Sequence, residues 1–288
     1  MLENCVSNWI VQVHPTWDHF RMGSRIVKAS PTHITRQVYR LQLTHPTVFD
    51  LPQDSDEYQD FCRIAHVDCL PTKADLLNHL RTDLPEWFLP LTVIIKRMKH
   101  DIDDMVDFYQ TGCTSADMFK HEKEAYERLK PVQGTAVPVY YGEAEYAGRR
   151  ALVLSDLGNK SFDEAPGYDK DIENVITKIE APFRALASCG VSHGNPDLHN
   201  LMLVDGESRI MIVDFELASL NDSLYWSQSQ CRLDAQECYG AYRHYRNILL
   251  RQHARQRMSE EEKEAERKEY QEADRRTAEF FNLMLYGQ

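Results

Sequence analysis

The chain has 288 residues, of which 42% are hydrophobic and 27% are charged, a mixture typical of globular proteins rather than disordered ones. Its 33 basic and 45 acidic residues give a formal charge of −12. Such an acidic chain has no general attraction for phosphate backbones or anionic lipid. We therefore expect neither a nucleic acid nor a membrane among its partners.

The cellular compartment is indicated by what the sequence lacks. No apolar run reaches the length of a membrane span, and residues 1–10 do not have the pattern of a signal peptide. The seven cysteines are odd in number and include no Cys-x-x-Cys pair, which favours reduced thiols in a reducing compartment. These features predict a cytoplasmic protein.

The first 90 residues carry the weakest pattern. Residues 9–13 and 37–43 have strand-like composition, but turn formers and prolines lie beside them. Between residues 45 and 90 five prolines interrupt the chain. This stretch is typical of an irregular insertion with small helices, one of which is predicted over residues 74–80.

Residues 91–154 have clearer signals. The β-branched run over residues 91–96 predicts a buried strand that ends in Lys96. A helix is expected over residues 116–129. Two apolar runs, residues 137–141 and 151–154, flank the turn signal Ala147-Gly148 and predict a hairpin.

A long helix and a second hairpin are predicted next. Residues 169–189 place apolar side chains three or four apart, and Gly190 follows as a stop signal. Residues 201–204 and 210–213 are apolar runs joined by a turn that starts with Asp205-Gly206, a strong hairpin signature.

The C-terminal stretch is predicted to be a charged helix with a solvated face. Ser259 and Glu262 have the spacing of a capping box, and Glu264/Lys268 and Glu272/Arg276 are favourable pairs four residues apart. A few apolar residues beyond them are expected to dock the end of this helix onto the body: Phe280, Phe281, Leu283 and Leu285.

The candidate functional residues lie in a polar loop over residues 193–200 and at the far end of the hairpin that follows it. This arrangement brings Asn200 and Asp214 to the same end of the hairpin. A carboxylate together with an amide oxygen is a pair of hard ligands that suits Mg²⁺, which takes its remaining ligands from water and nucleotide phosphates.

These motifs resemble those of the protein-kinase-like superfamily, especially its aminoglycoside-phosphotransferase-like and fungal kinase-like branch. The family's catalytic loop runs His-x-Asp-x-x-x-x-Asn, and its metal motif is Asp-Phe-Gly or a variant. Without gaps, His193 matches the loop histidine and Asn200 the metal-binding asparagine. Asp214 matches the metal-binding aspartate, and Glu216 stands where the family has glycine.

The resemblance extends backwards, so that it covers about residues 91–220. Lys96 matches the strand lysine that holds the nucleotide phosphates, and Glu122 matches the helix glutamate that pairs with it. The stretch containing Ser155, Asp156 and Leu157 resembles the hinge, whose backbone would meet adenine.

Two departures from the family pattern matter. Asn195 stands where the family has the aspartate that accepts the proton of the substrate hydroxyl, and an amide does not take up a proton at neutral pH. Asp197 would replace it only if the loop bends differently after Pro196. The chain also lacks a glycine-rich loop before Lys96, which makes close approach to phosphate harder.

Structural roles compete with each functional one. Lys96 alone would be read as a strand-end lysine reaching solvent, and Glu122 as part of a solvated helix face. Asp214 would cap the next turn, and His193 would brace the loop backbone. For His199 a supporting role in the loop is expected. The acidic run over residues 101–107 is read as a solvated loop, with a cation or basic-substrate site as the alternative.

We therefore expect an α+β, bilobal protein-kinase-like fold. Residues 1–154 would form an N-terminal lobe with a small antiparallel sheet and an insertion at about residues 45–90. Residues 155–288 would form a mainly helical C-terminal lobe that carries the catalytic-type loop and the charged helix. The cleft between the lobes would bind Mg²⁺ and ATP.

The predicted function is ATP-dependent phosphoryl transfer to a hydroxyl of a small molecule or a protein. The alternative is a pseudokinase, a nucleotide-binding or scaffold protein without transfer activity. The predicted catalytic residues are Asn195, Asp197 and Lys96; the predicted nucleotide-binding residues are Lys96, Glu122, Ser155, Asp156 and Leu157; and the predicted metal ligands are Asn200 and Asp214.

Overall fold

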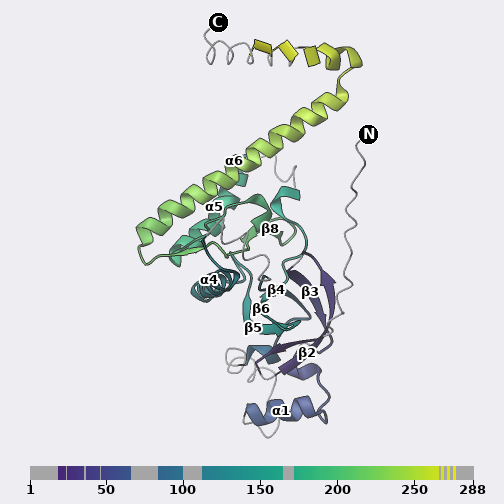
Figure 1. Ribbon diagram of the computed structural model, residues 1–288, viewed down its shortest axis with the longest axis vertical. Coiled ribbons are helices and arrows are strands. Elements are labelled where there is room, and N and C mark those ends of the chain that lie inside the picture. The colour runs from purple at the N-terminus through teal and green to yellow at the C-terminus, as the bar shows by residue number, and fades with distance from the viewer. Residues whose placement is uncertain are drawn as a thin grey trace, which may run out of the picture.

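The computed structural model describes residues 19–23, 25–35, 37–45, 47–65, 84–99, 112–164, 172–265, 267–268, 271–272 and 275–276. They form a β-barrel, a mainly helical part packed on one side of it, and a long helix that extends away from the body (Figure 1).

The barrel is a closed ring of six antiparallel strands in the order β1-β2-β3-β4-β6-β5. It closes because β1 pairs with β2 along its whole length and also with β5, through Arg21 and Glu145. The strands are β1 (His19–Met22), β2 (Arg25–His33), β3 (Val38–Leu43), β4 (Thr92–Arg97), β5 (Tyr140–Tyr146) and β6 (Arg149–Ser155).

The expectation of a bilobal protein-kinase-like α+β fold, with a small antiparallel sheet as its N-terminal lobe, is wrong. The observed architecture is a closed six-stranded barrel with a helical C-terminal part. The difference arises at β1, which the sequence pattern did not indicate. Because β1 bonds to strands on both of its sides, the sheet has no free edge there and becomes a ring.

The pleat of β4 decides which residues face the helical part. Val93 and Ile95 pack inside the barrel, whereas Ile94 packs against the core of the helical part. Successive side chains of a strand point to opposite faces, so Lys96, two residues after Ile94, is directed to the same side as Ile94. The barrel thus presents an ammonium group to the helices.

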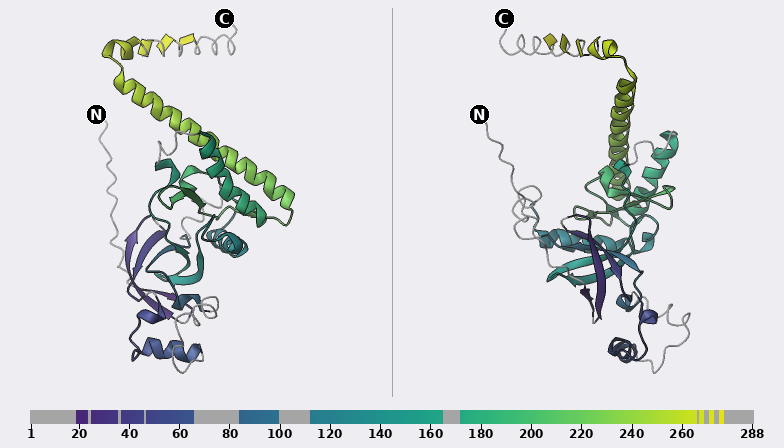
Figure 2. Two further views of the ribbon diagram at one scale, coloured as in Figure 1. Left: turned by 180° about the vertical axis from the view of Figure 1, so that it is seen from behind. Right: turned by 90° about the vertical axis from the view of Figure 1, so that its right-hand side faces the viewer.

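The insertion covers one end of the barrel with its own small core (Figure 2). Its elements are η1 (Val48–Asp50), α1 (Asp56–Ile64) and η2 (Pro85–Trp87). Phe61 packs against Trp87 with ring centroids 5.2 Å apart, and an isolated bridge joins Thr47 to Phe88. The part of the insertion between residues 66 and 83, with the helix expected over residues 74–80, lies outside the described residues.

The helical part is built around α5, the second hairpin and the first half of α6, which share one hydrophobic core. Short strands and 3-10 turns connect these elements. The bounds are α4 (Ser115–Arg128), η3 (Lys130–Val132), η4 (Phe162–Glu164), α5 (Ile172–Ser188), β7 (Val191–Ser192), η5 (Leu198–Asn200), β8 (Leu201–Val204), β9 (Arg209–Ile212), β10 (Ser219–Leu220) and α6 (Leu224–Arg257).

Helix α6 was not predicted, although it is the longest element of the described chain, with 34 residues. Its buried stripe consists largely of small or polar residues, such as Ser227, Cys231 and Ala235, which carry little hydrophobic signal. None of the described residues after Tyr242 is buried, and the second half of the helix projects beyond the body in Figure 1.

Several predicted elements are confirmed. The strands over residues 37–43 and 91–96, the helix over residues 116–129 and the hairpin at Asp205-Gly206 are present. The capping box is also formed: Ser259 N donates to Glu262, and Glu262 N donates to Ser259 Oγ. Residues 9–13, the acidic run over residues 101–107 and the apolar residues 280–285 lie outside the described residues.

Among the described residues, no helix combines the length and the apolar character needed to cross a membrane.

Arg25 ties the insertion to the barrel and gives a test of this arrangement. Its side chain is 1% exposed and donates hydrogen bonds to Glu57 Oε1 and to the carbonyl oxygens of Glu86 and His45. We expect Arg25→Ala to cost about 3 kcal/mol of unfolding free energy, since it leaves a carboxylate and two carbonyls without their donor. Urea unfolding measures the loss.

Lys28→Ala is the matched control for this variant. Lys28 lies on the same strand but is exposed, so its removal should change the free energy of unfolding by less than about 0.5 kcal/mol. Equal effects of the two substitutions would contradict the anchoring role of Arg25.

Candidate functional site

The candidate site is centred on the ammonium group of Lys96, which lies among three carboxylates. Lys96 Nζ is 2.8 Å from Glu122 Oε2, 2.6 Å from Asp214 Oδ1 and 3.0 Å from Glu216 Oε1. The carboxylates come from α4 and from the segment after β9, so three separate elements meet at one cation. The lysine side chain is 13% exposed.

Glu122 belongs to the buried face of α4, not to a solvated one. The helix begins with a capping box between Thr114 and Asp117, and its buried face carries Met118, Phe119, Glu122, Ala125 and Tyr126. Glu122 Oε1 also accepts a hydrogen bond from the backbone nitrogen of Phe215. Glu122 therefore joins the barrel strand to the segment after β9.

The pKa values of the cluster reflect burial and charge together. Burial raises the pKa of Glu122 to about 7, although the nearby Lys96 acts in the opposite direction. Burial acts to lower the pKa of Lys96, but Glu122, Asp214 and Glu216 outweigh it and hold this pKa well above its ordinary value. Lys96 is accordingly protonated at neutral pH.

Asp214 occupies a special backbone position directly after the hairpin. Its φ of 68° lies in the left-handed region, which non-glycine residues adopt rarely and mostly at functional or turn positions. Burial acts to raise the pKa of Asp214, but Lys96 outweighs this effect and the pKa lies below its ordinary value. The side chain is 38% exposed, so this carboxylate remains ionised and reachable from solvent.

Glu216 connects Lys96 to a second lysine. Its Oε2 lies 2.7 Å from Lys99 Nζ, while its Oε1 contacts Lys96. The cluster thus contains one more carboxylate than ammonium group. One oxygen from each of Glu122, Asp214 and Glu216 lies within 4.8 Å of the others, and the ammonium group of Lys96 occupies the position between them.

The space beside the cluster is small. A cavity of about 10 Å³ is lined in part by Lys96, Lys99, Ser115 and Glu216. That volume accommodates about one water molecule. With Glu216 in its observed position, this cavity is too small for a large ligand.

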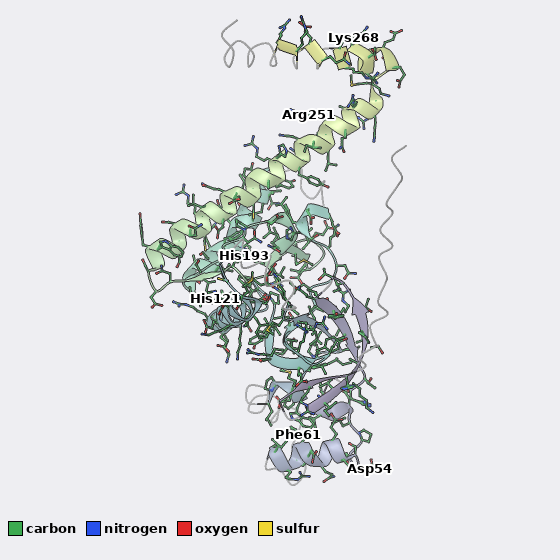
Figure 3. All side chains as sticks on the ribbon, viewed as in Figure 1. Asp54, Phe61, His121, His193, Arg251 and Lys268 are labelled. Carbon is green, nitrogen blue, oxygen red and sulfur yellow. The ribbon has the colours of Figure 1, made fainter. Side chains whose placement is uncertain are left out.

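His193, labelled in Figure 3, braces the loop, and it is fully buried. Its Nδ1 accepts a hydrogen bond from Asn195 N, so Nε2 carries the proton and donates to the carbonyl oxygen of Val213 at 2.8 Å. Burial lowers the pKa of the imidazole. The ring thereby fixes the loop against the residue that precedes Asp214, the structural role expected for it.

The loop also contacts α6 and residue 217. The buried Asp234 of α6 accepts a hydrogen bond from His193 N. Gly194 has a φ of 76°, and a Cβ there would overlap the carbonyl oxygen of Leu217. Only glycine allows this close approach of the two segments.

The predicted loop residues have different surroundings. Asn200 is 3% exposed. Its side-chain nitrogen donates to the backbone carbonyl oxygen of Asn195, and its backbone carbonyl oxygen accepts from Val213 N, next to Asp214. Asn195 and Asp197 are exposed. Asp197 Oδ1 accepts from His199 N and lies 2.8 Å from His199 Nδ1, so this carboxylate caps the turn η5.

The three residues predicted at the adenine position lie at the end of β6. Ser155 Oγ accepts a hydrogen bond from Val139 N. Asp156 forms a bidentate ion pair with Arg40 of β3, in which Arg40 Nε lies 2.7 Å from Oδ2 and Arg40 Nη2 lies 2.8 Å from Oδ1. Leu157 is partly exposed. The side chains of Ser155 and Asp156 are therefore engaged in joining barrel segments.

Three residues of the site were missed from the sequence. Glu216 was noted only as a replacement for glycine, yet it contacts both lysines. Lys99 lies three residues after Lys96, and this repeat of a basic residue near a strand end was the available signal. Asp234 carried no usable signal, because α6 itself was not predicted.

No protein-family model matches the sequence, and no curated protein resembles it significantly. The resemblance to the protein-kinase-like superfamily therefore stays a prediction from the motif residues.

The brace at His193 predicts a pH dependence. Because burial lowers the pKa of His193 in the folded state, the unfolded chain binds a proton more readily below the ordinary histidine pKa of about 6.5. The contribution of neutral His193 to stability is thus present above that pH and lost as pH falls. The raised pKa of Glu122 acts in the opposite direction, but it is common to both proteins. We therefore expect the unfolding free energy of His193→Gln, relative to that of the wild-type protein, to rise as pH is lowered from 7.5 to 5.5 in urea titrations.

His121→Gln provides the control, since His121 lies exposed on α4 (Figure 3). This variant should keep the wild-type pH dependence. If the unfolding free energy of His193→Gln depended on pH as that of the wild-type protein does, the role of the buried imidazole would be contradicted.

Proposed function

We propose that this protein is an ATP-dependent phosphotransferase that uses Mg²⁺ and acts on a hydroxyl of a small molecule or a protein. This proposal rests on the site and not on the fold. Its single strongest support is the Lys96 ammonium group, held between Glu122 of α4 and Asp214 after β9. A cation fixed in this way is suited to hold a phosphate group.

The chemistry of the donor set fits a magnesium ion. Carboxylate and amide oxygens are the ligands that Mg²⁺ prefers. Asp214, which is ionised and partly exposed, and Asn200, beside it across the hairpin, would be its ligands. The ion would neutralise charge on the phosphates.

The residues around the cluster would have different roles in phosphoryl transfer. Lys96 would bind phosphate oxygens, and Glu122 would keep the ammonium in position. The acceptor hydroxyl oxygen would form a bond to the terminal phosphorus as the bond from that phosphorus to the leaving diphosphate breaks. Asp197, the only carboxylate between residues 193 and 200, would receive the hydroxyl proton.

A second function is favoured by a specific observation in the loop. Asn195, at the position of the expected proton acceptor, is an amide, and Asp197 is engaged by His199. A loop of this kind suits a protein that holds a nucleotide without transferring its phosphate. This is the nucleotide-binding or scaffold alternative.

Nucleotide binding is tested by thermal unfolding with ATP, with and without Mg²⁺. At ligand about 100-fold above Kd, stabilisation by about 2.7 kcal/mol should raise Tm by roughly 5 °C in the presence of metal. Asp214→Asn should remove the metal-dependent part of this rise. Absence of a response in the wild-type protein at millimolar ATP would overturn nucleotide binding.

Asp205→Asn is the control for the metal test. It makes the same change of charge at the opposite end of the same hairpin, where the side chain is 59% exposed. Its response to Mg²⁺ should match that of the wild-type protein.

The identity of the proton acceptor separates the two functions. Slow hydrolysis of ATP, with water as acceptor, is the measurement. If Asp197 accepts the proton, Asp197→Asn should lower the rate about 10²-fold and Asn195→Asp should leave it nearly unchanged. A rise of that size in Asn195→Asp, with no effect of Asp197→Asn, would favour the binding protein instead.

A further inference from the structure

Glu216 is placed differently from the other two carboxylates around Lys96. Its two oxygens contact two different ammonium groups: Oε1 lies 3.0 Å from Lys96 Nζ, and Oε2 lies 2.7 Å from Lys99 Nζ. A phosphate group bridges paired ammonium groups in the same way, with more oxygens and more charge. The carboxylate of Glu216 therefore takes the place that an anionic ligand of this lysine pair would take.

We infer that Lys96 and Lys99 together form a binding site for an oligophosphate, and that Glu216 is a built-in competitor that such a ligand displaces. This inference rests on the proposed function, because it names the part of that site that receives the phosphates. It adds Lys99 as a second phosphate-binding residue and gives Glu216 a role that opposes binding.

Glu216 is held less firmly than Glu122. Glu122 is fixed in α4 by the backbone nitrogen of Phe215 as well as by Lys96. Glu216 lies in the turn after β9, and its carboxylate contacts the mobile ends of two lysine side chains rather than a backbone group. Its side chain is 15% exposed and thus lies at the boundary with solvent.

The local charge favours the exchange. With Glu216 in place, its negative charge lies against both ammonium groups. Withdrawal of Glu216 removes one negative charge from beside the ammonium groups, so the incoming phosphate meets less repulsion. The cavity of about 10 Å³ beside the lysines would enlarge by the volume of the departing side chain.

The experiment measures binding of inorganic tripolyphosphate to the full chain by isothermal titration calorimetry, without metal. Glu216→Gln removes the competing charge and keeps the shape, so we expect Kd to fall at least tenfold below the wild-type value. Lys99→Gln should weaken binding, and the double variant should lose the gain of Glu216→Gln. An unchanged or higher Kd in Glu216→Gln overturns the inference.

Glu143→Gln is the matched control. Glu143 pairs with Lys123 and Arg150 on the surface of the barrel, so its removal changes the net charge by the same amount away from the site. A gain in affinity as large as that of Glu216→Gln would mean a general charge effect and would overturn the inference. Should Glu216→Gln fail to fold, Glu216→Asp replaces it, because the shorter side chain no longer bridges both lysines and should also bind more tightly.

The outcomes distinguish this inference from the proposed function. If the wild-type protein gives no response to ATP and Mg²⁺ but Glu216→Gln binds tripolyphosphate, the proposed function fails and the inference stands. If the wild-type protein responds to ATP and Mg²⁺ but Glu216→Gln binds no tighter, the inference fails alone. If neither protein binds either ligand, both fail.

Discussion

The ion cluster around Lys96 is the interaction on which the site depends. A lysine on the outer face of a barrel strand meets Glu122 from α4 and two carboxylates from the segment after the second hairpin. Charged groups taken out of water require partners, so the loss of one member of the cluster would leave buried charge uncompensated. The same contacts that hold the barrel against the helical part thus assemble the candidate site.

Support for the cluster comes from the backbone of the loop as much as from its side chains. His193 links the loop to Val213, and Asp234 of α6 holds the loop from the other side. Gly194 lets the loop approach residue 217 closely. Contacts of residues several positions away in the chain therefore set the orientation of the Asp214 side chain. The site is positioned before any ligand binds.

The sequence allowed the local elements of the site to be predicted because their signals are local. The β-branched run before Lys96, the helix that carries Glu122 and the hairpin before Asp214 each show their pattern within a few residues. The contact of Lys96 with Glu122 was also expected from the motif order. The part played by Glu216 was not, because it depends on Lys99 lying within reach.

The overall architecture was predicted wrongly because it depends on pairing between distant segments. The barrel closes when β1 pairs with β5, which is separated from it by most of the barrel sequence. Strand β1 has only four residues, and its apolar content is too low to indicate a strand. Helix α6 was missed for a related reason: its buried stripe of serine, cysteine and alanine gains burial through close packing rather than through large apolar side chains.

The closing contact between β1 and β5 also has a consequence for how the chain folds. Contacts between distant segments form late, since the loop between them loses entropy when its ends meet. Until that contact forms, the unfinished ring exposes two strand edges that can pair with another polypeptide. Self-association is therefore a hazard of the nascent chain, and it ends when the last strand pair forms and the barrel loses its free edges.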